Sequence, residues 1–319
     1  MPARRISFVN FKGGVGKTSL AVNIAACLAH NLSQRVLLID CDVQSNASIW
    51  LMGVPRWDII NNVRGKSIYG AFLPNLPPLA NNIIPSVIQS SNGFRLIPTL
   101  DLLPATYELM DLEQEYQDGD GEPFYYRFYE HLRSVIDQYD YIIFDCPPNA
   151  LRACRCAIFA SQEIYVPCNQ DTLSLIGLSL LIRKIEQFHN HTVIQQRMIR
   201  DYQPAKIRGI VLNAVSATAN FDLTERLIRL KIQEARVRKV VSDDADILSQ
   251  QIRRAVQASH VVALNLPATL DKGKSALKEE YINLTRYIHN SSLNRRAEID
   301  GIERKNVTAR QAARRASKA

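Results

Sequence analysis

A glycine-rich loop between two apolar segments constrains the fold of this chain more than any other feature. Residues 11–19 read FKGGVGKTS, directly after the apolar run 6–10 and directly before the helix-period segment 19–31. Glycines permit backbone conformations that are closed to other residues, so successive N–H groups can point at one anion. The N-terminus of the following helix adds partial positive charge. A strand, this loop and a helix in that order predict a phosphate-binding loop rather than a bare glycine turn.

The same loop predicts the ligands of a nucleotide and its metal. We expect Lys17 to contact the β- and γ-phosphates and the Thr18 hydroxyl to coordinate Mg²⁺. ATP and Mg²⁺ are therefore the expected cofactors. The residues expected to bind the nucleotide through this loop are Gly13, Gly14, Val15, Gly16, Lys17, Thr18 and Ser19.

Apolar runs rich in Val and Ile alternate with helix-period segments. Near-continuous apolar strands between helices indicate a mostly parallel, twisted sheet with helices on both faces. With the loop, this predicts an α/β, three-layer P-loop NTPase fold. The expected strands are 6–10, 35–40, 139–145, 163–167, 206–213 and 261–266, and the expected helices are 19–31, 124–138, 174–187, 223–238, 244–258 and 275–289. Stretches 53–93 and 116–123 read as irregular, apart from a short helix around 67–72.

Composition and charge divide the chain into a body and a tail. Hydrophobic residues make up 46% and charged residues 22%, which excludes a mostly disordered chain. Residues 286–319 hold nine Lys or Arg and three Asp or Glu, and so carry most of the net charge of +8. We expect one ATPase domain over 1–289 and a basic, flexible tail over 290–319. No run of 18 apolar residues occurs, and the six cysteines lie mostly in apolar runs, as in a reduced, cytoplasmic protein.

One departure from the usual phosphate-loop pattern is informative. Phe11 stands five positions before Gly16, where the usual pattern has glycine, and a second lysine, Lys12, follows it. The form KGGxGKT resembles the deviant loop of the ParA/MinD family of ATPases. Residues 36–47 (VLLIDCDVQSNA), 139–148 (YDYIIFDCPP) and 207–213 (IRGIVLN) also resemble ParA segments in the right order. Val43 and Ser45 depart from the usual ParA segment, which has Pro and Gly there.

This resemblance implies roles for polar residues at the ends of the expected strands. Asp145, at the end of a buried strand, is placed to hold Mg²⁺ through a water ligand, and Asp40 and Asp42 end the neighbouring strand. By resemblance, Asp42 orients the attacking water, Asp40 supports the Mg²⁺ shell and Asn213 meets the adenine. Lys12 is implied to cross a dimer interface to the partner's nucleotide. The alternatives are caps or turns for the aspartates and Asn213, and a solvated surface lysine for Lys12.

The basic residues suggest what an ATP-bound dimer would bind. The tail has arginines among small residues, which suits DNA phosphates, whereas a membrane helix needs bulky apolar residues on one face. A second basic set lies on the helix expected at 223–238. The candidate DNA-binding residues are Arg226, Arg229, Arg236, Arg238, Arg314 and Arg315; a solvated helix face or tail is the alternative.

The expected function is an ATP-dependent partitioning ATPase. It would form a homodimer with ATP, bind non-specific DNA and no membrane, and be released by a ParB-like adaptor protein, in the cytoplasm on the nucleoid. Because the phosphate loop begins at residue 12, we expect no operator-reading domain before it. A MinD-like membrane-associated positioning ATPase is the first alternative. A metal-cluster relative, with Cys146, Cys154 and Cys156 as the candidate ligands, is the second.

Overall fold

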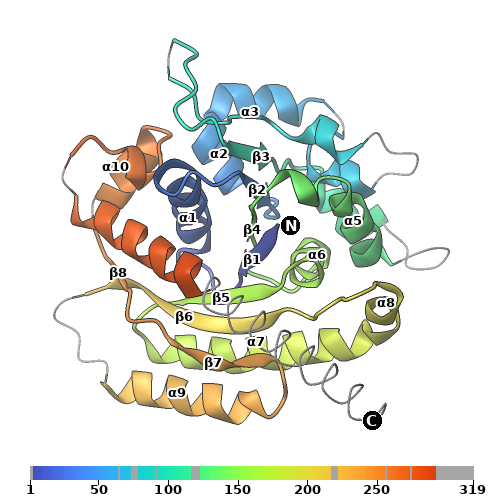
Figure 1. The fold of residues 1–319 in the computed structure, drawn as a ribbon, viewed down its shortest axis with the longest axis vertical. Coiled ribbons are helices and arrows are strands. Elements are labelled where there is room, and N and C mark those ends of the chain that lie inside the picture. Colours follow the sequence, from blue (N-terminus) through green and yellow to red (C-terminus); the bar gives the residue numbers. More distant parts are fainter. Residues whose placement is uncertain are drawn as a thin grey trace, which may run out of the picture.

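A parallel sheet with helices on both faces forms the centre of the molecule (Figure 1). The computed structural model describes residues 3–63, 65–72, 78–90, 92–115, 123–216, 222–255, 257–273 and 275–291. The named strands pair in the order β3-β2-β4-β1-β5-β6-β7, with β8 beside β6, and each of these pairs is parallel. The strands are β1 (Arg4–Phe8), β2 (Val36–Asp40), β3 (Leu100–Leu103), β4 (Tyr141–Asp145), β5 (Glu163–Cys168), β6 (Lys206–Val215), β7 (Val241–Ile247) and β8 (Ile252–Arg253).

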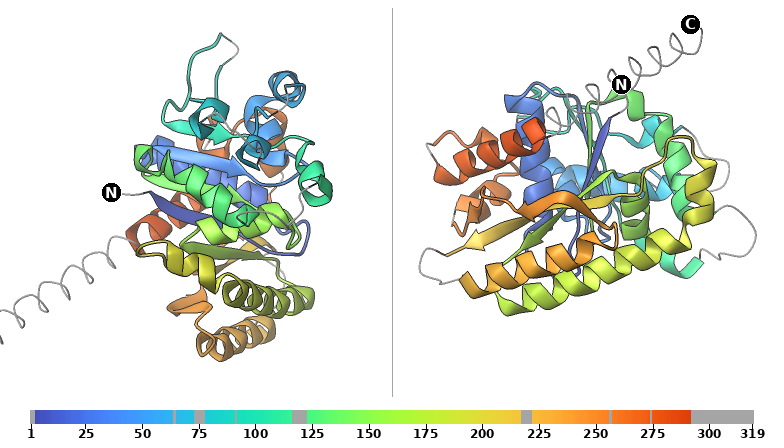
Figure 2. Two further views of the ribbon diagram at one scale, coloured as in Figure 1. Left: turned by 90° about the vertical axis from the view of Figure 1, so that its right-hand side faces the viewer. Right: turned by 60° about the horizontal axis from the view of Figure 1, so that its bottom comes forward.

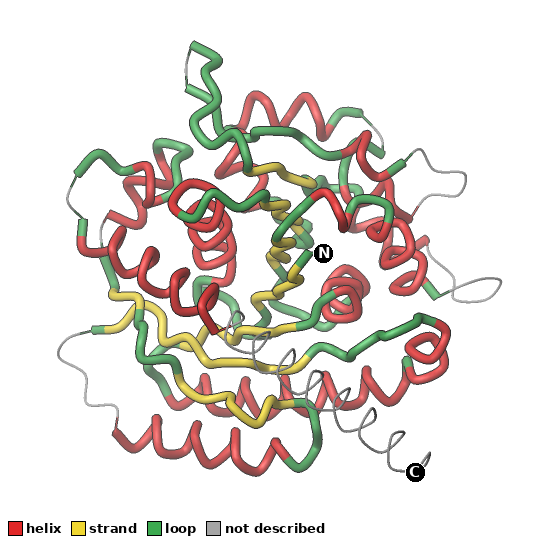
Figure 3. Tube along the Cα trace, in the orientation of Figure 1, coloured by secondary structure: helices red, strands yellow, loops and turns green. Residues whose placement is uncertain are grey.

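Helices connect the strands and cover the sheet, as Figure 3 shows by colour. They are α1 (Lys17–Asn31), α2 (Asn46–Met52), α3 (Val54–Asn61), α4 (Leu109–Glu115), α5 (Phe124–Arg133), α6 (Arg152–Ala160), α7 (Thr172–His191), α8 (Val193–Met198), α9 (Asp222–Arg236) and α10 (Gln257–Ala263). A last helix covers 276–291. In the views of Figure 2, α7 and α9 run side by side next to the β7 edge of the sheet.

Alternating strand residues supply two separate hydrophobic cores. In β4, Ile142 and Phe144 face one core, while Tyr141 and Ile143 face the other. The first core contains buried residues of α4, α5, α6, α7 and α9, and the second contains those of α1, α2, α10 and the last helix. Successive side chains of a strand point to opposite faces of the sheet, so the apolar run of β4 has both of its faces buried. This is expected for a parallel sheet inside an α/β protein.

A buried ion pair fixes the last helix to the amino end of the sheet. The Arg4 guanidinium donates to both carboxylate oxygens of Glu163, at 2.8 and 2.7 Å, and to the Ile288 carbonyl oxygen at 2.6 Å. Tyr141 Oη and His289 Nδ1 lie 2.7 Å apart beside it. The phosphate-binding sequence directly follows β1 and therefore lies at the opposite, carboxyl edge of the strands.

The structure confirms most expected elements and corrects the C-terminal third. Five of the six expected strands are present, and the short helix near 67–72 is the 3₁₀ segment Ile68–Phe72. The helix expected at 244–258 is wrong, because this stretch holds the end of β7 and all of β8. The strand expected at 261–266 is also wrong, because α10 extends into it. Strand β3 and helix α3 occupy parts of the chain for which no element was expected. The tail lies outside the described residues from 292 onward, so the domain boundary at 290 stays a prediction.

A half-buried histidine on α7, His189, makes the stability of the fold sensitive to pH. Burial, assisted by the charge of Lys206, lowers the pKa of His189 to about 4, and its Nε2 atom has no hydrogen-bond partner within the described residues. The unfolded chain binds a proton at this side chain near the ordinary pKa of 6.5, and the folded chain does not. This contribution to stability is therefore present above pH 6.5 and falls as pH drops.

We expect the free energy of unfolding to fall between pH 7 and pH 5 by about 2 kcal/mol more in the wild type than in His189→Gln. Below pH 6.5, the contribution of His189 falls by about 1.4 kcal/mol for each pH unit. Urea titrations at both pH values measure this difference. His30→Gln, which changes an exposed histidine on α1, is the control and should leave the wild-type pH dependence in place. An equal pH dependence in His189→Gln would contradict the assignment.

Candidate active site

The predicted phosphate loop is an open backbone cradle at the carboxyl end of β1. Gly14 and Gly16 have φ values of +71° and +84°, which residues with a side chain rarely adopt. A Cβ added at Gly13 or Gly14 would meet no atom within 4 Å, so the surface of the loop is open there. Gly16 is the N-cap of α1 and supplies no side-chain cap. The first N–H groups of α1 thus have no side-chain acceptor at the cap, and an anion is their natural partner.

Lys17 is a buried cation held by the loop itself. Its Nζ atom donates to the carbonyl oxygen of Lys12 at 3.1 Å. Burial lowers the pKa of Lys17, and the charge of Asp145 is the largest opposing influence. A single carbonyl acceptor is poor compensation for a buried ammonium, so phosphate oxygens would be better partners.

Asp145 is the least satisfied polar group of the site. It ends β4, is fully buried, and neither carboxylate oxygen has a hydrogen bond of normal geometry within the described residues. Asp145 is paired in register with Asp40 of the neighbouring strand β2. Burial and the charge of Asp40 raise the pKa of Asp145 well above its usual range. The Thr18 hydroxyl and Lys17 offset this only in part. A carboxylate without partners beside a threonine hydroxyl and an ammonium fits the phosphates and Mg²⁺ of a nucleotide.

Asp40 and Asp42 lie at the same edge but already have hydrogen-bond donors. Asp40 Oδ2 accepts from the Ser48 amide at 2.9 Å and from the Ser48 hydroxyl at 2.7 Å, and Asp40 Oδ1 accepts from the Asp42 amide at 3.1 Å. Burial raises the pKa of Asp40 to about 6. Asp42 Oδ1 accepts from the Gln44 amide at 3.0 Å. Asp40 therefore fastens α2 to the sheet, and the roles expected for both aspartates toward water and metal stay predictions.

Asn213 reaches the phosphate loop from β6. Its Nδ2 atom donates to the Val15 carbonyl oxygen at 2.8 Å, and a Cβ on Gly16 would lie only 1.9 Å from that nitrogen. The structure thus brings Asn213 to the phosphate loop, and its side chain supports the loop. Its contact with adenine stays a prediction.

Lys12 makes a contact that sequence reasoning missed. Its Nζ atom lies 2.6 Å from Asp171 Oδ2, and its backbone amide donates to Asn10 Oδ1 at 2.9 Å. Asp171 is also the N-cap of α7, because its Oδ1 accepts from the Ser174 amide at 2.8 Å. An Asp three residues before a Ser at a helix start is a recognisable cap. Its pairing with Lys12 is not visible in sequence, because 159 positions separate the two residues.

The basic residues expected on α9 do not form an open positive patch. Arg229 pairs with Asp246 and Glu225, and Arg238 Nη1 lies 3.0 Å from Glu186 Oε2. Arg236 donates to the Ala245 carbonyl oxygen at 2.8 Å. Arg226 is exposed and forms no ion pair within the described residues, and the candidates Arg314 and Arg315 lie outside them. DNA contact by these residues stays a prediction.

The remaining features describe what surrounds the site. All six cysteines are buried as free thiols. Within the described parts of the chain, no group of three or more Cys, His, Asp or Glu side chains is arranged so that it could hold a metal ion. Cys154 and Cys156 belong to no such group. The same residues contain no helix with the length and apolar character that a bilayer crossing requires.

Comparison with known proteins places this geometry among partitioning proteins. Residues 3–199 match a protein-family model described as an AAA domain. The chain is 34% identical over 217 residues to the chromosome partitioning protein ParA of Myxococcus xanthus, covering 68% of this chain and 67% of that protein. It is 28% identical over 283 residues to the sporulation initiation inhibitor protein Soj of Bacillus subtilis, covering 89% of this chain and 97% of Soj.

Solved structures agree in fold. An ATP complex of McdA from Cyanothece superposes with a TM-score of 0.66 at 14% identity, covering 90% of this chain and 96% of that one. The cell division ATPase MinD of Pyrococcus furiosus superposes with a TM-score of 0.60 at 18% identity, covering 90% of this chain and 99% of that one. The mostly parallel sheet flanked by helices is therefore that of P-loop ATPases, as the sequence predicts.

Two glycines of the loop should separate folding from ligand binding. Gly13→Ala adds a methyl group to open space, so we expect the free energy of unfolding to stay within about 0.5 kcal/mol of wild type. The methyl group should still weaken ATP binding at least about tenfold, because it obstructs close approach of the backbone to phosphate. Urea titration and isothermal titration with ATP measure the two effects.

Gly16→Ala is the matched variant that should damage the fold itself. Its Cβ would collide with Asn213, and its φ of +84° is strained for alanine, so we expect a loss above about 1 kcal/mol. A folded Gly13→Ala with unchanged ATP affinity would contradict the cradle.

Proposed function

We infer the function of this chain from its family, because it belongs to the ParA family of partitioning ATPases. It is a P-loop ATPase, and its function is ATP-dependent partitioning. We propose further that its working form is an ATP-bound homodimer on non-specific DNA, and that an adaptor protein of the ParB kind releases it by stimulating hydrolysis. Lys12 is the observation that carries this proposal, since within one subunit the second lysine of the loop forms only a partly exposed ion pair with Asp171.

The residues of the loop would bind the triphosphate. The N–H groups of 13–19 face the anion, and Lys17 exchanges the Lys12 carbonyl oxygen for phosphate oxygens. Thr18 and Asp145 would hold Mg²⁺, Asp145 through a water ligand. Mg²⁺, when bound, neutralises charge on the phosphate oxygens. Asp42 lies close enough to Lys17 to influence its pKa and is the residue that would orient the attacking water.

Lys12 would act on the nucleotide of the second subunit. In the chain alone, Lys12 lies against Asp171, half-buried and directed toward the start of α7. Formation of the dimer would exchange this carboxylate for phosphate oxygens of the partner's ATP, much as an arginine finger supplies charge in trans. The exchange costs little, because a partly exposed ion pair contributes only about 0–1 kcal/mol.

DNA binding is the second part of the proposal, and it depends on arginines that can contact phosphates. Arg226 on α9 is exposed and forms no ion pair with another described residue. Arg314 and Arg315 belong to a tail in which basic residues outnumber acidic ones. Contacts of this kind with phosphates give affinity without sequence preference and release counterions.

We expect Lys12→Ala to abolish ATP hydrolysis while leaving ATP affinity within about threefold of wild type, because Lys17 and the loop backbone supply the binding in cis. Phosphate release measures hydrolysis, and isothermal titration measures binding. Unchanged turnover in Lys12→Ala would contradict the dimer.

Asp171→Asn is the matched control for the lysine. Asparagine also caps helices well, so this change keeps the cap on Ser174 and removes only the charge that holds Lys12. Turnover should be retained, and the dimer should form at lower ATP concentration, as sedimentation velocity would show. Loss of turnover equal to that of Lys12→Ala would show that Asp171 itself is needed for hydrolysis.

We expect duplex DNA of unrelated sequences to bind with ATP and to lose at least about tenfold in affinity between 50 and 200 mM salt. Arg226→Glu and the pair Arg314→Ala/Arg315→Ala should each weaken binding and reduce the salt slope. Arg200→Glu, an exposed change outside α9, is the control. Equal binding with and without ATP, or an equal loss in Arg200→Glu, would contradict the assignment.

A further inference from the structure

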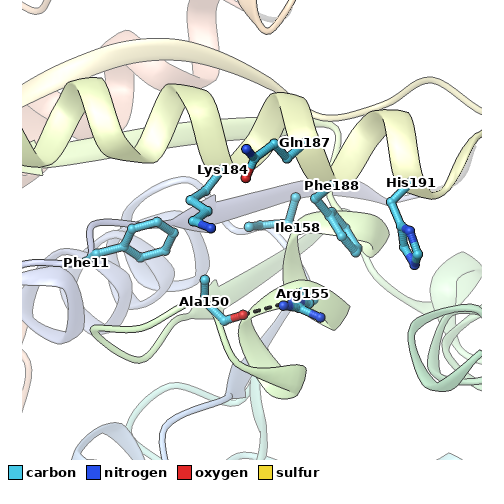
Figure 4. Close-up of a pocket in the computed structure, with 8 residues that line it drawn as sticks. All are labelled: Phe11, Ala150, Arg155, Ile158, Lys184, Gln187, Phe188 and His191. Carbon is cyan, nitrogen blue, oxygen red and sulfur yellow. Dashed lines mark hydrogen bonds between the residues drawn. The ribbon is translucent and has the colours of Figure 1, made fainter. Parts of the chain in front are cut away.

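A cavity of about 350 Å³ lies next to the phosphate loop and is not used by the residues described so far. It opens between α6 and α7 (Figure 4). Its walls come from the phosphate loop, the segment that follows β4, α6 and α7. The lining residues are Phe11, Ala150, Arg155, Ile158, Lys184, Gln187, Phe188 and His191.

The cavity has an apolar floor. Ile158 and Phe188 are buried parts of the core between α6 and α7, and Phe11 is a half-buried residue packed against the same core. These three side chains leave a space suited to one large apolar side chain. Pockets of about 300 Å³ and above are of the size that accepts ligands.

Cations surround the opening of the cavity. Arg155 on α6 and Lys184 on α7 are exposed and lie on opposite sides of it, and neither has a carboxylate partner within the described residues. None of the eight lining residues is acidic. Arg155 Nε donates to the Ala150 carbonyl oxygen at 2.9 Å, which fixes the guanidinium and leaves its terminal nitrogens for a carboxylate. The pocket therefore combines an apolar site with unneutralised positive charge.

The cavity contacts both catalytic loops. Phe11 directly precedes Lys12, and Ala150 lies in the loop that follows Asp145. An occupant that orders these two residues would restrict the backbone on either side of the nucleotide. Binding here and ATP hydrolysis should therefore be coupled.

We propose that this pocket binds an acidic segment of a partner protein, with one large apolar side chain on the floor and carboxylates on Arg155 and Lys184. This inference rests on the proposed function, because it gives the chemistry of a partner that acts on hydrolysis. Charge complementarity argues for such an occupant. The tail of this chain is basic and does not match, and DNA phosphates would use the cations but not the apolar floor.

Fluorescence anisotropy with synthetic peptides tests the proposal on the full chain, in EDTA and without nucleotide. One pool of nine-residue peptides has four Asp or Glu around a central Phe or Leu in a Ser/Gly background. A second pool replaces the acids with Lys, and a third replaces the central residue with Gly. We expect the first pool to bind, the second not to bind, and the third to bind about tenfold more weakly. Because ATP is absent, this result does not depend on the ATPase or on dimer formation.

The variants decide where the peptides bind. The double variant Arg155→Glu/Lys184→Glu should weaken binding of the acidic pool at least tenfold. Lys184→Glu alone changes an exposed side chain and should also weaken binding of this pool. Arg183→Glu makes the same charge change on α7 outside the pocket and should stay within twofold. Equal losses in Arg183→Glu, or equal binding of the first and third pools, would overturn the proposal. If duplex DNA displaced the first and third pools to the same extent, the cations of the pocket would form a binding surface for phosphates instead.

Discussion

The buried carboxylate of Asp145 is the constraint on which the arrangement of the site depends. An unpaired carboxylate in a protein interior is costly, and Asp145 has no hydrogen bond of normal geometry within the described residues. The parallel register of β4 with β1 and β2 places it level with the ends of both strands, and so beside Asp40 and under the phosphate loop. Lys17 and Thr18 are the nearest compensation, and both belong to the loop that a nucleotide would bind. The Asp145 carboxylate thus lowers the stability of the chain alone, and the same carboxylate is well placed to hold a metal ion through its water ligands.

The two lysines of the loop show how the chain satisfies charged groups before any ligand arrives. Lys17 uses a carbonyl oxygen of its own loop, and Lys12 uses Asp171 at the start of α7. Neither arrangement is strong, since one is a single neutral acceptor and the other is a partly exposed pair. Both partners are therefore exchangeable for phosphate oxygens at small cost. Asp171 keeps its second function, the cap of α7, whichever partner Lys12 has, so the exchange need not disturb the helix.

The parts of the fold that could be predicted from sequence are those fixed by local pattern. The strand, loop and helix at the N-terminus, and the apolar run that ends at Asp145, are contiguous and strongly patterned. The helix predicted at 244–258 included the second half of β7. The exposed positions of this strand are Asp243, Asp244 and Asp246, which have low strand propensity but keep an edge strand from pairing with other chains. The apolar run at 261–266 was read as a strand, since such short runs do not distinguish strand from helix. The contacts of Lys12 with Asp171 and of Asn213 with Val15 join distant segments, and no local pattern encodes them.

Net charge proved a weaker guide to partners than the pairing of individual charges. Helix α9 is rich in arginine, yet Arg229 on the helix pairs with Asp246, and Arg238, just after the helix, pairs with Glu186. The solvent side of the helix and its end instead presents Leu223, Leu230 and Val237, with 71%, 48% and 86% of their surface exposed. A paired arginine offers little field to a polyanion, because its charge is compensated within about one ion-pair distance. Arg226 on α9, and Arg155 with Lys184 above the apolar floor between α6 and α7, are among the cations that form no ion pair within the described residues. These positions differ in their surroundings: Arg226 lies on an exposed helix face, as a contact with phosphates would require, whereas Arg155 and Lys184 lie beside apolar side chains, as the proposed acidic and apolar segment would require.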